Sequence, residues 1–389
     1  MNIGHVLGNP PTAMNGVVAS VSTSSEAAIA AGHQAKLVFP NSIPEESAGE
    51  RWHALPGLAL PWQDDYRAWL AGPEQLARVL REFDTDLVHG HHLFQTGELA
   101  LAAARQIGRP LIVTMHTDIE SYAHYVPVPV PPFQRFLMRR HATDLLNRVD
   151  QIIVPTEPVG ELLESYGISQ PMAINPTGIR CADYQSSASD LNLEELGINP
   201  SRPFILLVSR LAAEKDPWLF VEAFHHYIGP RFPELQLVLV GPGPFEQRLR
   251  RYVRRHREQK NIIVTGRITS SALKPLFRRA LLFAYPSATD TQAIVITEAM
   301  AAGLAVVAVK RLGPAKIVKD NVTGRLVEHR PAPEDRELQI RLFASAILEL
   351  LTDERGRATL GQAAEIEAAN YDLAITTAAQ LAIYASLLK

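Results

Sequence analysis

Charged side chains follow an apolar run in the second half of the sequence, and their spacing is suited to an anionic ligand. Arg210 and Lys215 lie five residues apart, directly after the run Phe204–Val208. Ligands of open α/β sheets bind outside the carboxyl ends of the strands, and two cations there can neutralise a diphosphate. An ordinary charged loop leading into a helix has the same composition, so the pair alone leaves both interpretations open.

Two acidic residues lie near the start of a helix that we expect over residues 293–302. Asp290 precedes this helix, where a carboxylate either caps the first turn or faces the positive end of the helix dipole. Glu298 follows on roughly the same face among apolar residues, so its carboxylate needs a polar partner. The hydroxyl groups of a ribose would satisfy that need.

The first half offers two weaker candidates. His116 directly follows the strand-like run Leu111–Met115, although a histidine in such a place is often structural. The loop GNPPTAMNG (8–16) opens a helix at Gly16. A glycine-containing loop at a helix N-terminus can hold a phosphate, or it can need glycine only for its turn.

Two patterns suggest a metal, and we set both aside. Asp84 and Asp86 form a DxD sequence, but it immediately precedes an apolar strand-like run. His89, His91 and His92 lack the spacing of a known zinc site. We therefore expect neither a metal nor a cofactor.

Short apolar runs alternate with amphipathic stretches along the whole chain, which predicts parallel βαβ units and two doubly wound α/β domains. We expect the first domain over residues 1–180 and the second over residues 181–370, with a polar seam at 181–203. A C-terminal helix at about 371–389 is expected to pack back on the first domain. The expected strands lie at 3–7, 37–39, 86–89, 111–115, 152–154, 172–175, 204–208, 235–240, 262–264, 281–285, 305–309 and 324–327. The expected helices include 16–31, 73–83, 95–107, 217–228, 245–257 and 293–302.

Composition limits the class of protein. The chain has 389 residues, 47% of them hydrophobic, which is enough for two domains. Its single cysteine, Cys181, rules out an intrachain disulfide and suits a reducing compartment. The first residues, MNIGHVLGNP, show no basic and apolar pattern of a signal peptide. We also expect no transmembrane span, because Glu298 and Gly303 interrupt the longest apolar stretch. The net charge of -3 and the lack of a binding motif argue against a nucleic-acid partner. These features predict a cytoplasmic protein.

Residues 204–328 resemble the donor half of the retaining GT-B glycosyltransferases of family 4. The matching stretches are SRLAAEKD, LVLVGPGPFEQRLR, VTGRI and DTQAIVITEAMAAGLAVVA, the last resembling the Glu-x7-Glu region of that family. The resemblance implies a GT-B fold, in which two Rossmann-like domains face each other across a cleft. It also implies that Arg210 and Lys215 clamp the donor diphosphate and that Glu298 holds the ribose hydroxyls. Donor contacts are further implied for Gly241, Arg267, Asp290, Thr291, Gln292 and Ala293.

The first half resembles the same family less densely, through MHTDIESYAHYVP, VDQIIVPTEPVGELLESYG and PTGI. The resemblance implies that His116 reaches the donor sugar and that Gly16 lies near the donor phosphates. Two positions depart from the family pattern: Asp290 replaces the usual Glu, and Ala293 replaces a usual Gly. Both departures bear on which sugar is accepted.

Within the family, HTDIESYAHYVP and SATDTQAIVITEAMAAG are most similar to the diacylglycerol glucosyltransferase branch. That branch is peripheral to membranes, and the basic-apolar segments 131–148 and 246–260 suit an anionic lipid surface. Packing inside the domain, or a solvated face for the second segment, would explain them equally. The expected acceptor or membrane face consists of Tyr122, His124, Tyr125, Phe133, Arg135, Arg139 and Arg140.

The resemblance implies transfer of a hexose, with glucose from UDP-glucose as the first expectation, to a lipid hydroxyl such as that of diacylglycerol. It implies retention of anomeric configuration, no metal, and a cytoplasmic enzyme at the inner face of the plasma membrane. Three alternatives stay open: a soluble acceptor such as a sugar phosphate, a sugar-nucleotide-binding protein without turnover, and, more remotely, a sugar-nucleotide epimerase.

Overall fold

The computed structural model describes residues 1–13, 15–42, 50–60, 63–120, 130–185, 191–256 and 261–388. The chain divides into two compact units. Unit 1 consists of Met1–Gly178 and Leu373–Lys389, and unit 2 of Ile179–Asp372. The boundary that we expected after residue 180 falls just beyond this division.

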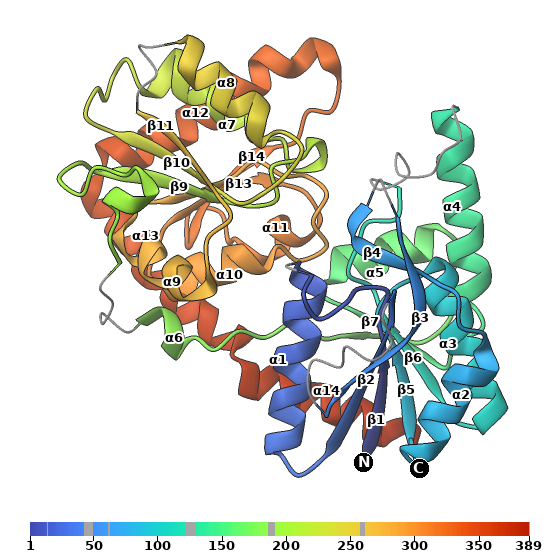
Figure 1. Cartoon of the computed structure of the whole chain (residues 1–389). Coiled ribbons are helices and arrows are strands. Elements are labelled where there is room, and N and C mark those ends of the chain that lie inside the picture. The colour runs from blue at the N-terminus through green and yellow to red at the C-terminus, as the bar shows by residue number, and fades with distance from the viewer. Residues whose placement is uncertain are drawn as a thin grey trace. The chain divides into compact units, whose positions relative to one another are not determined.

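Unit 1 is built on an eight-stranded sheet with the strand order β4-β3-β2-β1-β5-β6-β7-β8 (Figure 1). Neighbouring strands are parallel except for the edge pair β3 and β4, which is antiparallel. The strands are β1 (Asn2–Val6), β2 (Gln34–Asn41), β3 (Trp52–Leu60), β4 (Gln63–Trp69), β5 (Leu87–Gly90), β6 (Leu111–Thr114), β7 (Gln151–Val154) and β8 (Met172–Ile174).

Helices cover both faces of this sheet, so the inner strands are apolar on both sides. On β1, Ile3 packs with Tyr384 of the C-terminal helix α14, whereas Val6 packs with the cluster that contains Leu80 of α2. In Figure 1, α1 and α14 lie on one face and α2 and α3 on the other. The helices of unit 1 are α1 (Gly16–Ala30), α2 (Pro73–Glu82), α3 (Phe94–Ile107), α4 (Pro131–Leu146), α5 (Glu157–Ser165) and α14 (Leu373–Leu387).

Strands β3 and β4 were not predicted from the sequence. β3 contains Pro56 and Gly57, and β4 begins with the polar residues Gln63 and Asp64. Of the two strands, only β4 lies at the edge of the sheet, where polar side chains are tolerated. β3 pairs with both β2 and β4, and its Pro56 lies in the last pair with β2, opposite Asn41. The pattern of a buried strand is therefore missing from both segments.

Unit 2 contains an all-parallel six-stranded sheet with the order β11-β10-β9-β12-β13-β14, the order of a doubly wound nucleotide-binding fold. Its strands are β9 (Phe204–Val208), β10 (Gln236–Val240), β11 (Ile262–Gly266), β12 (Phe283–Tyr285), β13 (Val306–Lys310) and β14 (Gly324–Glu328). Its helices are α6 (Ala182–Gln185), α7 (Pro217–Ala223), α8 (Glu246–Arg255), α9 (Ser270–Arg279), α10 (Ile294–Ala301), α11 (Leu312–Ile317), α12 (Arg336–Thr352) and α13 (Glu354–Ala368). Shorter turns are η2 (Glu194–Leu196), η3 (Ala213–Lys215), η4 (Phe224–Ile228), η6 (Pro333–Asp335) and η7 (Ala369–Tyr371).

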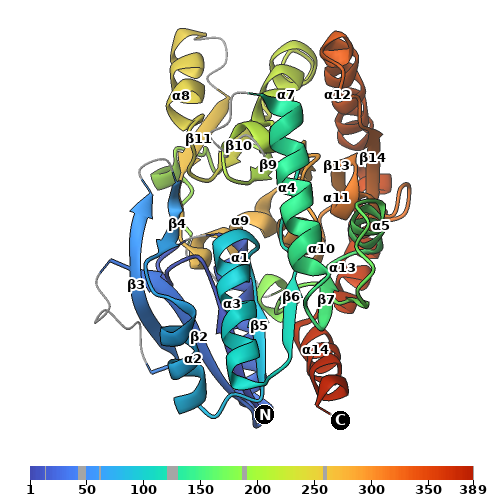
Figure 2. The ribbon, with the colours of Figure 1, turned by 90° about the vertical axis from the view of Figure 1, so that its right-hand side faces the viewer.

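The chain returns to unit 1 at its end, where α14 adds Tyr384, only 1% exposed, to the core beside Ile3 and Ile112. Within the described residues, no helix combines the length and the apolar character needed to cross a bilayer. Figure 2 shows the ribbon from a second direction, in which α14 again lies beside the strands of unit 1.

Candidate functional site

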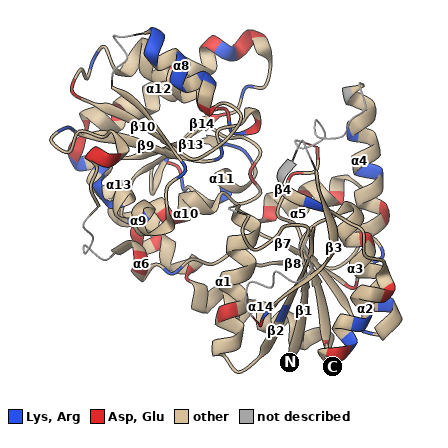
Figure 3. Ribbon diagram, viewed as in Figure 1, with Lys and Arg blue, Asp and Glu red and all other residues tan. Residues whose placement is uncertain are grey.

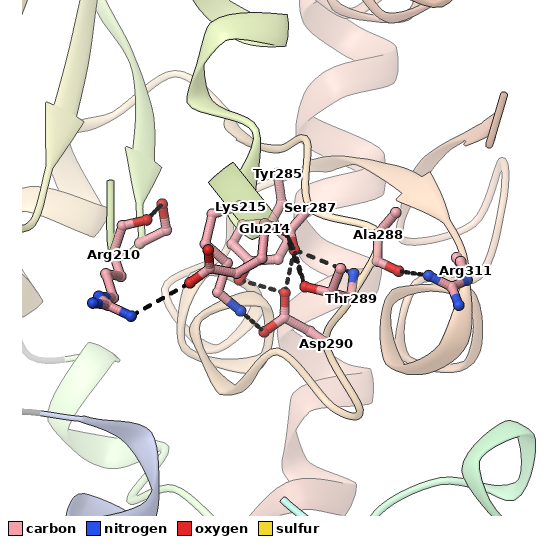
Figure 4. A network of polar contacts seen from close by, with 10 residues as sticks. Arg210, Glu214, Lys215, Tyr285, Ser287, Ala288, Thr289, Asp290 and Arg311 are labelled. Carbon is pink, nitrogen blue, oxygen red and sulfur yellow. Dashed lines mark hydrogen bonds and ion pairs between the residues drawn. The ribbon is translucent and has the colours of Figure 1, made fainter. Parts of the chain in front are cut away.

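A network of polar contacts surrounds Asp290 in the loop after β12 (Figure 4). Lys215 Nζ lies 2.5 Å from Asp290 Oδ1. On the other oxygen, Oδ2, the hydroxyl groups of Tyr285 and Ser287 donate hydrogen bonds of 2.9 and 2.5 Å. Three donors thus satisfy the carboxylate, so Asp290 does not act as a side-chain cap of α10.

The cations that the sequence singled out lie at the carboxyl end of β9. Lys215 closes the short turn η3 and is mostly buried, with its side chain 12% exposed. Arg210 is more open, at 41%, and forms a loose ion pair of 3.5 Å with Glu214. The structure therefore joins Lys215 to Asp290, two residues that lie far apart in the sequence, and leaves the Arg210 guanidinium near the surface of unit 2.

Contacts with two other segments fix the loop that carries Asp290. Thr289 Oγ1 donates a hydrogen bond of 3.0 Å to the carbonyl oxygen of Glu214. Arg311 Nη1 donates one of 2.7 Å to the carbonyl oxygen of Ala288, and the Gly313 amide donates one of 3.0 Å to the Asp290 carbonyl oxygen. The Asp290 carboxylate therefore lies on a loop that these three hydrogen bonds hold in place. Sequence reasoning missed Tyr285, Ser287 and Arg311, because nothing in their spacing marks them.

The start of α10 carries the remaining residues of the predicted acid-Thr-Gln-Ala segment. Thr291 and Gln292 are buried. Ala293 has a φ of 64°, in the left-handed region that glycine adopts without strain. Gly313 packs against this turn, and a Cβ at Gly313 would lie 2.4 Å from Gln292 Cα. The backbone keeps the geometry of a glycine turn although alanine occupies the position.

Glu298 finds its polar partner within the protein. Tyr184 of α6 donates a hydrogen bond of 2.5 Å to Glu298 Oε1. Burial raises the pKa of Glu298, and burial together with the Glu298 carboxylate raises the pKa of the Tyr184 phenol. Tyr184 was missed because it lies in the polar seam, more than a hundred residues before its partner. A ribose is therefore not needed to explain why this helix tolerates a carboxylate.

Gly241 and Arg267 follow the neighbouring strands β10 and β11. Gly241 has a φ of 129°, and a Cβ there would lie 2.0 Å from the carbonyl oxygen of Ser209. Only glycine allows the chain after β10 to come this close to the end of β9. Arg267 is exposed directly after β11. Both residues lie at the carboxyl edge of the sheet, as do Arg210 and Lys215.

In unit 1, His116 follows β6 and lines a small polar cavity of about 30 Å³ together with His91, Ser20, Asn175 and Thr177. Burial lowers the pKa of His116 to about 4, so its ring is neutral at pH 7. Gly16 is exposed as the first residue of α1, and the Asn15 side chain caps that helix by accepting from Val17 and Val18. The loop before α1 therefore supplies the residue that caps the helix, Asn15.

The DxD sequence and the histidine group, which suggested a metal in the sequence, lie at different places in unit 1. Asp86 accepts a hydrogen bond of 2.8 Å from the Asn2 backbone amide at the amino end of the sheet, which is a structural contact. Ring nitrogens of His5, His89 and His91 lie within 4.8 Å of one another, so His5 and not His92 completes a group of three. Both ring nitrogens of His89 already contact hydroxyl groups, of Tyr384 and Thr114, each at 2.6 Å.

The predicted acceptor or membrane face falls partly on α4. Phe133 and Phe136 are 49% and 55% exposed, and Arg135 is exposed beside them. Arg139 pairs with Glu120 and stacks on Tyr166, and Arg140 pairs loosely with Asp144. Tyr122, His124 and Tyr125 lie outside the described residues. Figure 3 shows Lys and Arg on α4 and, more densely, on α8, the second basic segment.

Comparison with known proteins gives the family. Residues 14–183 match the family described as Glycosyltransferase Family 4, and residues 189–366 match Glycosyl transferases group 1. The chain is 27% identical over 373 residues to the Streptococcus pneumoniae protein named alpha-monoglucosyldiacylglycerol synthase, covering 92% of this chain and 80% of that one. It is also 27% identical over 321 residues to the GDP-mannose-dependent alpha-mannosyltransferase of Mycolicibacterium smegmatis, covering 81% of each.

A solved structure of HepE from Anabaena in complex with UDP-glucose superposes with a TM-score of 0.75 at 19% identity, covering 100% of both chains. This likeness concerns the fold, and it agrees with the expected GT-B class. From the two matching families and the fold together, we conclude that the chain belongs to the GT-B glycosyltransferases, with a family 4 domain in its first half and a group 1 domain in its second.

Proposed function

We propose that the protein is a retaining hexosyltransferase that moves glucose from UDP-glucose to a hydroxyl group of a lipid such as diacylglycerol, without a metal ion. The names of the relatives support this choice of donor and acceptor. One is called an alpha-monoglucosyldiacylglycerol synthase, and HepE was solved with UDP-glucose.

The observation that carries the proposal is the group formed by Lys215, Asp290 and Arg210 at the carboxyl edge of the unit 2 sheet. Ligands of open parallel sheets bind at this edge. With no donor bound, Asp290 is the counter-ion of Lys215. A donor diphosphate supplies a stronger anion, so Lys215 and Arg210 bind its oxygens and Asp290 becomes available to the hydroxyl groups of the sugar.

In the reaction, the bond between the sugar C1 and the diphosphate oxygen breaks, and a bond from the acceptor oxygen to C1 forms on the same face. The acceptor hydroxyl proton passes to the departing phosphate oxygen. Arg210 and Lys215 stabilise the charge that develops on the leaving group, which is electrostatic catalysis by pre-positioned cations. His116, neutral at pH 7, contacts the sugar by hydrogen bonding and not as a cation.

The α4 surface supports a peripheral position on an anionic membrane, and hence a cytoplasmic enzyme at the inner face of the plasma membrane. Phe133, Phe136 and Leu137 are all more than a third exposed, and Arg135 lies among them. Aromatic and aliphatic side chains beside arginine bind the interface of an anionic bilayer.

A second candidate, a mannosyl donor or a soluble acceptor, is favoured by the equal identity to a GDP-mannose-dependent mannosyltransferase and by the departures at Asp290 and Ala293. The test incubates the protein with UDP-glucose, UDP-galactose or GDP-mannose, with or without diacylglycerol micelles, in the presence of a chelator. The proposal predicts an α-linked glucolipid from UDP-glucose only. Mannose transfer, or nucleotide release that does not depend on lipid, would favour the second candidate.

A further inference from the structure

Unit 2 contains a cavity of about 280 Å³ beside the loop that carries Asp290. The loop residues Pro286, Ala288 and Thr289 line this cavity. Its other walls come from the segment after β9, from the end of β13 and from the segment that leads from β14 into α12. Pockets for small molecules begin at roughly 300 Å³, whereas the polar cavity of unit 1 has only about 30 Å³. The unit 2 cavity is therefore large enough for a small molecule.

Gln339 of α12 lines the cavity and has a side-chain donor without a partner. Its Oε1 accepts a hydrogen bond of 2.7 Å from the Arg330 backbone amide, and this contact determines which end of the side-chain amide is the nitrogen. Its Nε2 has no hydrogen-bond partner among the described residues, although Gln339 is only 4% exposed. Because a buried donor without an acceptor is unfavourable, this amide needs an acceptor that the described residues do not supply.

Arg330 adds a positive charge to the same cavity. Its side chain is 42% exposed, and its ion pair with Asp335 is loose, at 4.0 Å. Arg311 also lines the cavity, where its Nη1 donates to the carbonyl oxygen of Ala288. Burial and the nearby Arg311 lower the pKa of His329, so this lining residue is neutral at pH 7. Two guanidinium groups therefore supply positive charge, and the imidazole adds none.

The carboxylates of the lining have cationic partners within the protein. Asp216 accepts hydrogen bonds of 2.5 and 3.2 Å from Arg336. Glu214 Oε1 makes no hydrogen bond within the described residues, but it lies 3.5 Å from Arg210, and its side chain is only 3% exposed. Figure 4 shows Arg210 and Arg311 at opposite ends of the polar network, with Asp290 between them. The loosely paired group of the cavity is thus a cation, which favours an oxyanion as the ligand.

We propose that this cavity is a second anion site, in which Arg330 and Gln339 bind the phosphate or carboxylate group of a small organic molecule. Much of the remaining lining is apolar, including Pro331 and Pro333, so it fits a compact organic body better than a bare ion. The bound molecule contacts the loop whose next residue, Asp290, pairs with Lys215. The site goes beyond the proposed function and does not depend on the identity of the sugar donor.

The test is calorimetric titration of the full chain with glycerol phosphate, glycerate and glycerol at constant ionic strength, without sugar donor. We expect at least one of the two anions to bind and neutral glycerol not to bind, and the stronger anion identifies the preferred group. Arg330→Gln should weaken this binding roughly 10- to 150-fold, because a hydrogen bond to a charged group is lost. Arg341→Gln removes the same charge from an exposed position on α12 and should bind as wild type does.

Hydrogen exchange shows where the anion binds. Peptides that cover residues 328–340 contain part of the cavity and none of the donor-site cations, so the anion should slow their exchange. Arg210→Gln should keep both this protection and the affinity. Gln339→Glu keeps an acceptor for the Arg330 amide but replaces the side-chain donor with a carboxylate, so it should abolish binding of the anion.

Two results would overturn the proposal. One is the absence of binding by either anion, which would leave the cavity to water. The other is binding that Arg210→Gln removes and Arg330→Gln leaves unchanged, which would place the anion at the donor-site cations. A protein that binds the anion as expected but transfers no sugar would refute the proposed function and leave this second site intact.

Discussion

Acidification should destabilise unit 1 far more than unit 2, because unit 1 buries a group of neutral histidines. Burial lowers the pKa of His5 and His92 to about 3 and that of His116 to about 4, and it holds those of His89 and His91 well below the usual value. The unfolded chain takes up protons on these residues near pH 6.5, whereas His5, His92 and His116 of the folded chain stay neutral until the pH approaches 4. Protons therefore favour unfolding, and stability is lost as the pH falls below 6.5.

The magnitude follows from the unfolded-state pKa. Between pH 7.5 and 5.5, each histidine that stays neutral in the folded chain lowers the unfolding free energy by about 1.4 kcal/mol, so His5, His92 and His116 together lower it by about 4 kcal/mol. His89 and His91 act in the same direction. The loss is a large part of the whole stability of a typical domain, roughly 5–15 kcal/mol. In unit 2 the sign is opposite for Glu298 and Asp216, because burial raises the pKa of each carboxyl group and protonation relieves that cost.

The assay is urea denaturation of the full chain at pH 7.5 and at pH 5.5, followed by a brief deuterium pulse at one fixed pH. Mass spectrometry of peptides then reports the unfolding of each unit separately. We expect the urea midpoint of unit 1 to fall steeply and that of unit 2 to change little. Replacing His92 with Asn should lessen the loss in unit 1 by about 1.4 kcal/mol. Parallel losses in the two units, or a loss in unit 1 below that of one histidine, would refute the reasoning.

Three further predictions concern single contacts. Tyr184→Phe removes the hydroxyl group that donates to the Glu298 carboxylate. Thermal denaturation should therefore show a loss of about 1.5–3 kcal/mol in the free energy of unfolding. An unchanged midpoint would mean that this hydrogen bond does not contribute to stability. Ala293→Gly relieves a left-handed alanine, and this gain exceeds the entropy cost of glycine, so the same assay should show a stabilisation of about 0.5–1 kcal/mol. A lower or unchanged midpoint would mean that the alanine is not strained. The double variant Phe133→Ser, Phe136→Ser should pellet less with anionic vesicles while keeping its melting temperature, and equal pelleting would place membrane binding elsewhere.

Most of the fold could be predicted from the sequence, since strands buried on both faces are visible as short apolar runs. Phe204–Val208 was predicted with the limits that the structure shows. The pattern failed at the unit 1 edge, where β3 contains Pro56 and β4 begins with polar residues. The edge strand β4 needs no apolar residues on both faces, and Pro56 with Gly57 interrupts the apolar pattern of β3, so composition reveals neither strand.

The charged residues of the candidate site could be predicted from the sequence, whereas the residues that bond them could not. Arg210, Lys215 and Asp290 were found from their places after expected strands. Their bonding to Tyr285 and Ser287, like that of Glu298 to Tyr184, depends on contacts between distant segments. The contact between His5 and His91 shows the same limit, because it forms only when β1 and β5 become neighbours in the sheet.

Calorimetric titration of the wild-type protein with UDP-glucose, in the presence of a chelator, tests the central claim most directly. We expect binding in wild type and a loss of about 1.5–3 kcal/mol of binding free energy, or roughly 10- to 150-fold in Kd, in Arg210→Gln. Arg248→Gln, which removes the same charge from α8 where Arg248 stacks on Trp218, should bind as wild type does. Absence of binding in wild type, or equal weakening in both variants, would contradict a donor site built on Arg210, Lys215 and Asp290.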